Sequence, residues 1–143
     1  MVTITPRIAD VSLIEFVNPD GLAFSPGYTH VVIAQRKKTA YVSGQVATDQ
    51  TGQVVGRGDL RLQTEQVYRN LQVALSAAGA TFADVVKTTT FVVNLNTDTL
   101  SVIRQVRRQF LSSDHPPAST LIGVTALAIE GLLIEIDAIA AVD

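Results

Sequence analysis

Residues 116–143 read PPASTLIGVTALAIEGLLIEIDAIAAVD, and two acidic residues stand near their end in an apolar run that finishes at Val142. In an extended strand, residues two apart face the same side, so Glu135 and Asp137 share one face while their apolar neighbours share the other. An antiparallel strand with one solvated face explains this pattern. A carboxylate that lines a cleft as a general acid or base explains it as well. This segment by itself leaves both interpretations open.

The composition is that of an apolar single-domain protein. A chain of 143 residues buries roughly two-thirds of its unfolded surface in one core, so we expect one domain over residues 1–143. Hydrophobic residues make up 47% of the chain, charged residues 17%, and the mean hydropathy is +0.29. A composition this apolar indicates that partner subunits cover part of the protein surface. We therefore expect an oligomer.

Charge and residue usage exclude several classes of function. With 11 Lys and Arg against 13 Asp and Glu, the net charge of -2 provides no attraction to nucleic acid or to anionic membranes. There is no cysteine, and His30 and His115 lie far apart in sequence without a metal-binding spacing, so we expect no metal site. The N-terminal residues lack a leader pattern, and no run approaches the ~18 apolar residues of a membrane span. We expect a cytoplasmic protein with no membrane or nucleic-acid partner.

Three β-rich runs predict strands in the first third of the chain, at residues 11–17, 30–34 and 39–45. The polar residues 35–38 between the second and third runs are typical of a hairpin with a solvated tip. Gly44 falls near the end of the third run, where a backbone without a side chain favours close approach by another group.

The middle of the chain predicts a helix followed by an internal strand. Apolar residues recur at spacings of three and four, with Asp59 as a plausible N-cap and Gly79 as the stop. This stripe consists of Val67, Leu71, Ala74, Leu75 and Ala78. The β-branched run at residues 85–93 then predicts the central strand of a sheet.

A second helix and two strands follow. Thr97 or Asp98 is a suitable N-cap for a helix whose stripe contains Leu100, Ile103, Val106 and Phe110. On this wheel the arginines at positions 104, 107 and 108 fall on the exposed face, which we interpret as solvated. Residues 120–127 and 132–141 predict strands around a turn at residues 129–131. The order β-β-β-α-β-α-β-β indicates an α+β or α/β layer with two helices on one side.

Four blocks of the sequence resemble the Rid family, also called YjgF-type proteins and often labelled L-PSP endoribonucleases. The blocks are PGYTHVV at 26–32, YVSGQVATDQTGQVVG at 41–56, QTEQVYRNLQVALSAAGATFADVVKTTTFVVNL at 63–95, and PPASTLIGVTALA with LLIEIDAIA at 116–128 and 132–140. Each block alone is a weak signal, but four in register cover more than a hundred residues.

The resemblance implies a chorismate-mutase-like α+β fold, as in YjgF and L-PSP proteins, with a mostly antiparallel mixed sheet and two helices on one face. It further implies a homotrimer with a central barrel and ligand clefts at the subunit interfaces. Family members with established chemistry hydrolyse reactive 2-imino or enamine acids to 2-keto acids and ammonia, and they use no metal or organic cofactor.

The resemblance also implies site residues. By position, Tyr28, Ser43 and Gly44 would line one wall of the cleft, with Asn96 near its mouth. Glu135 matches the family's acid that holds or activates the attacking water, and a carboxylate in an apolar interface can shuttle a proton near neutral pH. The opposite wall would come from a neighbouring subunit and would consist of Ser119, Thr120 and Leu121. Asp137 would have a structural or secondary role.

One position departs from the deaminating members of the family. They carry an arginine after the Pro-Ala of the last block, where it grips the substrate carboxylate, and this chain has Ser119 there. A neutral hydrogen bond contributes ~1 kcal/mol net, against up to ~3 kcal/mol for a charge-assisted one. We therefore expect a substrate other than a standard 2-imino acid, unless Arg57 or Arg61 replaces the missing guanidinium.

Two functions of different classes remain open. The first is hydrolysis of an imine, an enamine or a related C–N bond of a small metabolite. The second is a non-catalytic trimeric module that binds a metabolite in the same cleft. A ribonuclease is disfavoured, because RNA cleavage without metal requires paired acid and base groups and a basic groove with stacking aromatics.

Overall fold

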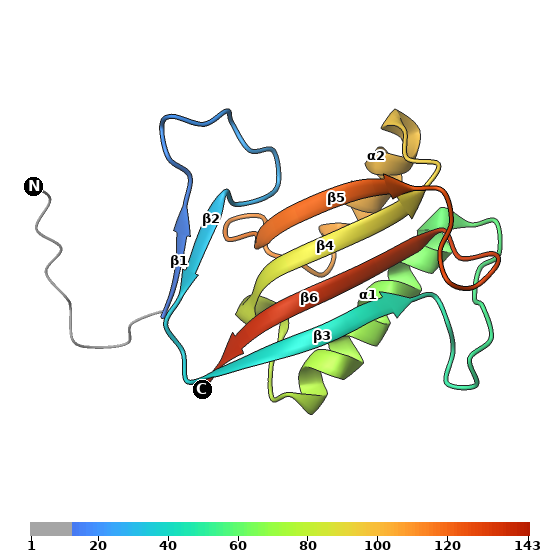
Figure 1. Ribbon diagram of the computed structural model, residues 1–143, viewed down its shortest axis with the longest axis horizontal. Helices are drawn as coiled ribbons and strands as arrows, with labels where there is room; N and C mark the ends of the chain where they lie inside the picture. The colour runs from blue at the N-terminus through green and yellow to red at the C-terminus, as the bar shows by residue number, and fades with distance from the viewer. Residues whose placement is uncertain (1–12) are drawn as a thin grey trace, which may run out of the picture.

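A four-stranded sheet backed by two helices forms the body of the protein, and a two-stranded ribbon lies beside it (Figure 1). The computed structural model describes residues 13–143, so residues 11 and 12 of the first predicted strand lie outside the described part. In chain order the elements are β1 (Ile14–Val17), β2 (Val31–Ala34), β3 (Lys38–Val46), α1 (Leu60–Ala77), the 3₁₀ turn η1 (Phe82–Asp84), β4 (Val85–Val93), α2 (Thr97–Arg107), β5 (Ala118–Val124) and β6 (Ile134–Val142). The predicted order of strands and helices is confirmed.

The main sheet has the strand order β3-β6-β4-β5. β6 pairs antiparallel with both β3 and β4, whereas β5 runs parallel to β4 at the edge. Both helices lie behind the sheet in Figure 1. The predicted α+β class, with a mostly antiparallel mixed sheet and two helices on one face, is confirmed. Although β5 and β6 are consecutive, they are not paired with each other, because β4 lies between them.

The alternation in β6 decides which face the helices cover. Ile134, Ile136, Ala138 and Ala140 are all buried, while Glu135 and Asp137 on the opposite face are only partly covered. Burial of the apolar face against α1 supplies the hydrophobic stabilisation of the sheet. No helix of residues 13–143 covers the other face of the sheet (Figure 1).

The predicted hairpin of residues 30–34 with residues 39–45 is wrong. β2 pairs with β1, from Ile14 opposite Ala34 to Val17 opposite Val31, and β3 pairs with β6. Residues 35–37 carry the chain from one sheet to the other, and Lys38 already belongs to β3.

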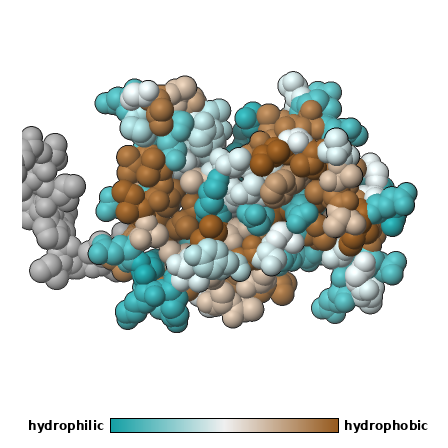
Figure 2. Space-filling view, in the orientation of Figure 1, coloured by the Kyte–Doolittle hydropathy of each residue, from teal (hydrophilic) through white to brown (hydrophobic). Residues whose placement is uncertain are grey.

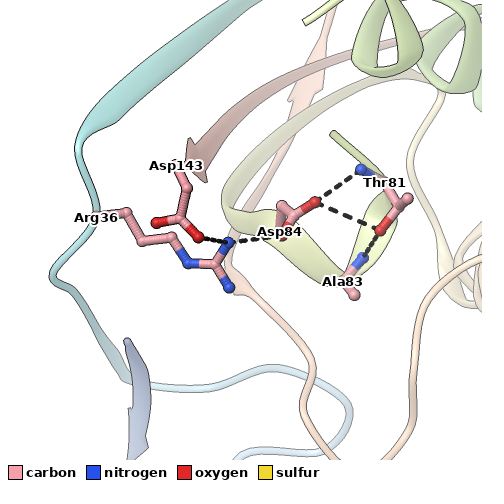
Figure 3. Close-up of polar contacts among 5 residues, drawn as sticks. All are labelled: Arg36, Thr81, Ala83, Asp84 and Asp143. Atoms are coloured by element: carbon pink, nitrogen blue, oxygen red, sulfur yellow. Dashed lines mark hydrogen bonds and ion pairs between the residues drawn. The ribbon is translucent and has the colours of Figure 1, made fainter. Parts of the chain in front are cut away.

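Arg36 anchors this connection (Figure 3). Its Nη1 atom lies 3.3 Å from Asp84 Oδ1 and 3.6 Å from Asp143 Oδ2. Asp84 also accepts a hydrogen bond from the backbone N–H of Thr81, which closes a capping box at η1. The Arg36 side chain thus links the β2–β3 connection to η1 and to the end of β6.

The helix ends follow their capping residues. Asp59 is the N-cap of α1 as predicted, since its carboxylate accepts from the Leu62 N–H at 3.0 Å. Gly79, with φ +72°, directly follows the last turn of that helix. The prediction of Thr97 or Asp98 as the cap of α2 is wrong, because the Asn96 side chain accepts from the N–H groups of residues 98 and 99.

The core lies between α1 and the sheet and extends to α2. Val67, Leu71 and Leu75 of α1 are buried, whereas Ala78 of the predicted stripe is exposed. Tyr68 stacks on Phe110 with ring centroids 5.0 Å apart, and Phe82 meets both rings edge-on. This aromatic cluster joins α1, η1 and the chain after α2.

The predicted solvated face of α2 is only partly correct. Arg108 is exposed, but Arg107 is half-buried and burial lowers the pKa of its guanidinium. The Arg107 side chain packs against the loop that contains Gly27, and a helical wheel of α2 alone cannot predict this contact.

Within residues 13–143, no helix is long and apolar enough to cross a membrane.

Candidate functional site

Glu135 lies on the uncovered face of the sheet, directly over the backbone of Gly44. A β-carbon placed on Gly44 would stand 2.8 Å from Glu135 Cδ and 2.9 Å from Glu135 Cγ, closer than van der Waals contact permits. Gly44 does not have a positive φ, so the close approach and not the backbone conformation requires glycine here. The strand continues to Val46, one residue beyond the predicted run of residues 39–45.

A bulge in β3 creates this approach. Val42 pairs with Ala138 and Gln45 with Ile136, so β3 has one residue more than β6 over this interval. Ser43 and Gly44 are the residues of the bulge, and Ser43 is exposed. The bulge therefore places a small backbone surface beside the Glu135 side chain.

The two acidic residues of β6 have different surroundings. Asp137 Oδ1 accepts a hydrogen bond of 3.1 Å from the Thr89 N–H on β4, its partner in register. Within residues 13–143 no hydrogen-bond donor reaches the Glu135 carboxylate. Asp137 thus stabilises the strand pair, in agreement with the structural role expected for it, whereas Glu135 is available to a water molecule or a ligand.

Gln63 of α1 holds the start of β6, and sequence reasoning did not identify it. Its side chain is completely buried. Gln63 Nε2 donates to the carbonyls of Gly131 at 2.8 Å and Gly56 at 3.2 Å, and its Oε1 accepts from the Leu133 N–H at 2.8 Å. These bonds position the backbone two residues before Glu135. The available signal was its position four residues before Val67, on the apolar stripe of the helix.

Asn70, about two turns after Gln63 on nearly the same side of α1, holds the end of β3. Its Nδ2 donates to the carbonyls of Val46 at 2.8 Å and Thr48 at 3.0 Å, and its Oδ1 accepts from Gln66. Val46 is the register partner of Glu135. Polar side chains of α1 therefore fix both strands on which Glu135 and Gly44 stand.

Asn96 lies at the same end of the sheet but is engaged in the helix. It follows β4, whose Phe91 is the other register partner of Glu135. Its Oδ1 caps α2, and its Nδ2 donates to the Asn94 carbonyl at 3.1 Å. The polar atoms of the Asn96 side chain thus serve the turn in this chain.

Tyr28 lies elsewhere, in the loop before β2. Its ring meets His30 edge-on with centroids 5.2 Å apart, and both rings line a broad hollow that also contains His115. The neighbouring Thr29 donates through its N–H to the Pro117 carbonyl and through its hydroxyl to the Pro116 carbonyl. The loop that carries Tyr28 is therefore held beside the start of β5 through Thr29, and not beside Glu135.

The histidines, distant in sequence, share this hollow but are engaged separately. His30 Nε2 lies 2.7 Å from the Ala23 carbonyl, and the His115 ring packs on Phe16 at 5.0 Å. In the part of the chain that the structure describes, no group of three or more His, Cys, Asp or Glu residues could hold a metal ion.

The segment Ser119, Thr120 and Leu121 occupies the edge strand. Thr120 lies in register with Thr89 and, through it, with Asp137, and its hydroxyl accepts from Lys87 Nζ at 2.6 Å. Two strand spacings and one same-face step separate it from Glu135, a distance of about 12 Å. Ser119 is in register with the buried Thr88, and Leu121 packs against the core. One chain therefore does not bring this segment to Glu135.

Neither alternative arginine reaches Ser119 or Glu135 within the chain. Arg57 Nη1 donates to the Glu130 carbonyl at 3.2 Å and covers Gly131. Arg61 Nη2 donates to Gln105 Oε1 on α2 at 2.6 Å. Both guanidinium groups therefore serve other contacts.

The strand order β3-β6-β4-β5 with two helices on one face defines a class of small α+β proteins. The profile of the family described as "Endoribonuclease L-PSP" matches residues 21–142. The chain belongs to this family, which includes the Rid and YjgF-type proteins.

Relatives and solved structures agree with this assignment. The chain is 34% identical to the 2-iminobutanoate/2-iminopropanoate deaminase of Homo sapiens over 114 residues, 79% of this chain and 78% of the relative. It is 35% identical to the protein DfrA of Myxococcus xanthus over 113 residues, 79% of this chain and 83% of the relative. The crystal structure of the Rid-family protein YyfB of Yersinia pestis superposes with a TM-score of 0.82 at 40% identity, over 90% of this chain and 98% of that one.

Proposed function

We propose that this protein is a Rid-type hydrolase that cleaves the C=N bond of a small metabolite in clefts between the subunits of a homotrimer, without a cofactor. The observation that carries the proposal is Glu135, a carboxylate held over Gly44 with no hydrogen-bond donor from residues 13–143. Membership of the family, with a 2-iminobutanoate/2-iminopropanoate deaminase among its relatives, supports the same chemistry.

In the proposed reaction Glu135 acts first as a general base and then as a general acid, and it carries one proton. The carboxylate takes a proton from water as the water oxygen bonds to the carbon of a protonated imine, and the C=N π electrons move to nitrogen. The protonated Glu135 then returns that proton to nitrogen, the C–N bond breaks, and the hydroxyl oxygen forms the carbonyl as it gives its proton to the departing ammonia. One water is consumed, and one carbonyl compound and one ammonium ion are formed.

The trimer is supported by the uncovered face of the sheet. Tyr41 is 80% exposed and Ile122 is 39% exposed, and both belong to the face that carries Glu135. Figure 2 shows apolar side chains among polar ones on this side of the molecule. A neighbouring subunit on this face would remove this apolar surface from water, which is favourable. In this proposal a neighbouring subunit on this face also supplies Ser119, Thr120 and Leu121, which the chain itself does not bring to Glu135. Tyr28, Ser43 and Gly44 line the opposite wall, with Asn96 near the mouth of the cleft.

Ser119 determines the substrate class in this proposal. A serine hydroxyl lacks the two-pronged, charged grip of an arginine on a carboxylate, so the substrate is an imine or enamine other than a standard 2-imino acid. The same serine keeps a second function open, a trimeric module that binds a metabolite without catalysis.

The test is ammonia release from imines generated in solution, with and without a carboxylate next to the C=N bond. Wild type, Glu135→Gln and Ser119→Arg are compared with the buffer rate. We expect wild type to accelerate hydrolysis of an imine without the carboxylate, Glu135→Gln to lose this, and Ser119→Arg to gain activity on imino acids. If none of the three exceeds the buffer rate and Glu135→Gln changes only ligand affinity, the binding module replaces the hydrolase.

A further inference from the structure

The end of α2 and the loop before β2 enclose a second hollow, apart from Glu135. Two arginines of α2 and the arginine that follows it line this hollow, together with Gly27, Phe24 and Leu111. Its volume is about 350 Å³, within the ~300–1,000 Å³ range of small-molecule sites. Its remaining lining residues include the hydroxyl groups of Ser112 and Ser113.

Within residues 13–143, the positive charge that lines this hollow has no acidic partner. Arg104, Arg107 and Arg108 all line it, and no Asp or Glu does. Among residues 13–143, none makes an ion pair or a hydrogen bond with any of the three guanidinium groups. A half-buried cation normally has an anion beside it, because removal from water costs free energy that only a counter-charge offsets.

Arg107 is the most constrained of the three. Its Nη2 atom would lie 2.5 Å from a β-carbon on Gly27, so the guanidinium group packs directly on that backbone. Burial lowers its pKa, and repulsion by Arg104 and Arg108 adds to this, while Tyr68 opposes it. Attraction to the carboxyl end of the helix dipole explains basic residues in the last turn. It does not explain why one of them is covered by a loop.

We propose that this hollow binds the phosphate group of a small phosphomonoester. The three guanidinium groups match a dianion with several acceptor oxygens, and the serine hydroxyls add neutral donors. Phe24, which is 89% exposed, and Leu111 offer an apolar wall for the organic part. The inference does not depend on hydrolysis at Glu135.

The experiment is calorimetric titration of the full chain with phenyl phosphate in a low-salt buffer at neutral pH. We expect saturable binding with one site per chain. Arg107→Gln removes charge-assisted hydrogen bonds, so the Kd rises about tenfold or more. The matched control is Arg69→Gln, an exposed arginine on α1, which should leave the Kd unchanged. Absence of binding by wild type, or an equal loss in the control, would overturn the proposal.

A second variant and two further ligands test the same proposal. Arg108→Gln alters an exposed side chain and should weaken binding even if Arg107→Gln fails to fold; an unchanged Kd in Arg108→Gln, with Arg107→Gln unfolded, would overturn the proposal. Inorganic phosphate should bind more weakly than phenyl phosphate, and equal binding would overturn the role of the apolar wall. Malonate tests a dicarboxylate in place of phosphate, and tighter binding of malonate would overturn the choice of phosphate.

Discussion

The side chain of Glu135 on β6 rests on the α-carbon of Gly44 on β3, in space that a β-carbon at position 44 would fill. The β3 bulge, the Gln63 hydrogen bonds and the Asn70 hydrogen bonds all act on the two strands that meet there. The carboxylate that we propose as the proton carrier is therefore placed by backbone geometry and not by a side-chain partner.

Gly44→Ala should displace Glu135. The added methyl group overlaps Cδ and Cγ of the glutamate, and overpacking of this kind costs about 1–3 kcal/mol in the free energy of unfolding. We expect lower hydrolytic activity with a retained fold, measured by ammonia release and thermal unfolding. Gly21→Ala is the control, because a β-carbon there meets nothing within 4 Å. Full activity in Gly44→Ala would show that the position of Glu135 is unimportant.

Asp137→Ala should affect stability and not chemistry. It removes the acceptor of the Thr89 N–H, which costs about 1–2 kcal/mol in the free energy of unfolding. Glu135→Gln should show the reverse, with an unchanged midpoint of denaturation and lost turnover. Denaturant titration and the ammonia assay on both variants separate the two roles. Equal loss of turnover in the two would mean that both acids take part in the reaction.

Gln63→Leu should be among the most damaging substitutions in α1. Its side chain is completely buried and serves three backbone groups, and the leucine would leave these groups unpaired. We expect a loss of about 2–4 kcal/mol in the free energy of unfolding. Amide hydrogen exchange at Leu133 should accelerate as well. Gln72→Leu, at an exposed position of the same helix, is the control and should change neither quantity appreciably.

Tyr68 should make the protein less stable at high pH. Burial raises the pKa of its hydroxyl, so the folded state keeps a proton that the unfolded chain releases near pH ~10. Stability from this group is therefore complete below about pH 10 and falls as the pH rises towards the folded pKa. Tyr68→Phe should lose less stability than wild type between pH 8 and pH 11, measured by denaturant midpoints. Tyr41→Phe, with an exposed ring, should follow wild type; identical profiles for all three proteins would refute the assignment.

Several structural features were predictable because they depend on neighbouring residues. Asp59 and Gly79 delimit α1 through local capping geometry, and the β-branched run at residues 85–93 coincides with β4. The alternation in β6 correctly separated its buried face from the face with Glu135. Resemblance to the Rid family identified the family, whereas the roles of the site residues remain predictions.

Other features involve residues that the sequence does not relate to each other. Arg36, in the connection between β2 and β3, contacts Asp84 and Asp143, so this cluster joins three separate segments of the chain. The burial of Arg107 depends on a loop some eighty positions earlier in the chain. A helix wheel or a strand pattern contains no information about such contacts.

The amino-acid sequence by itself determined the order of strands and helices, the N-cap of α1 and the buried face of β6, because periodicity and capping operate over a few residues. Only the tertiary structure decided that β6 lies between β3 and β4, that Glu135 rests on Gly44, and that three arginines surround one hollow. Strand pairing and side-chain burial are settled by packing among residues distant in sequence, so they emerge only when the whole core is assembled.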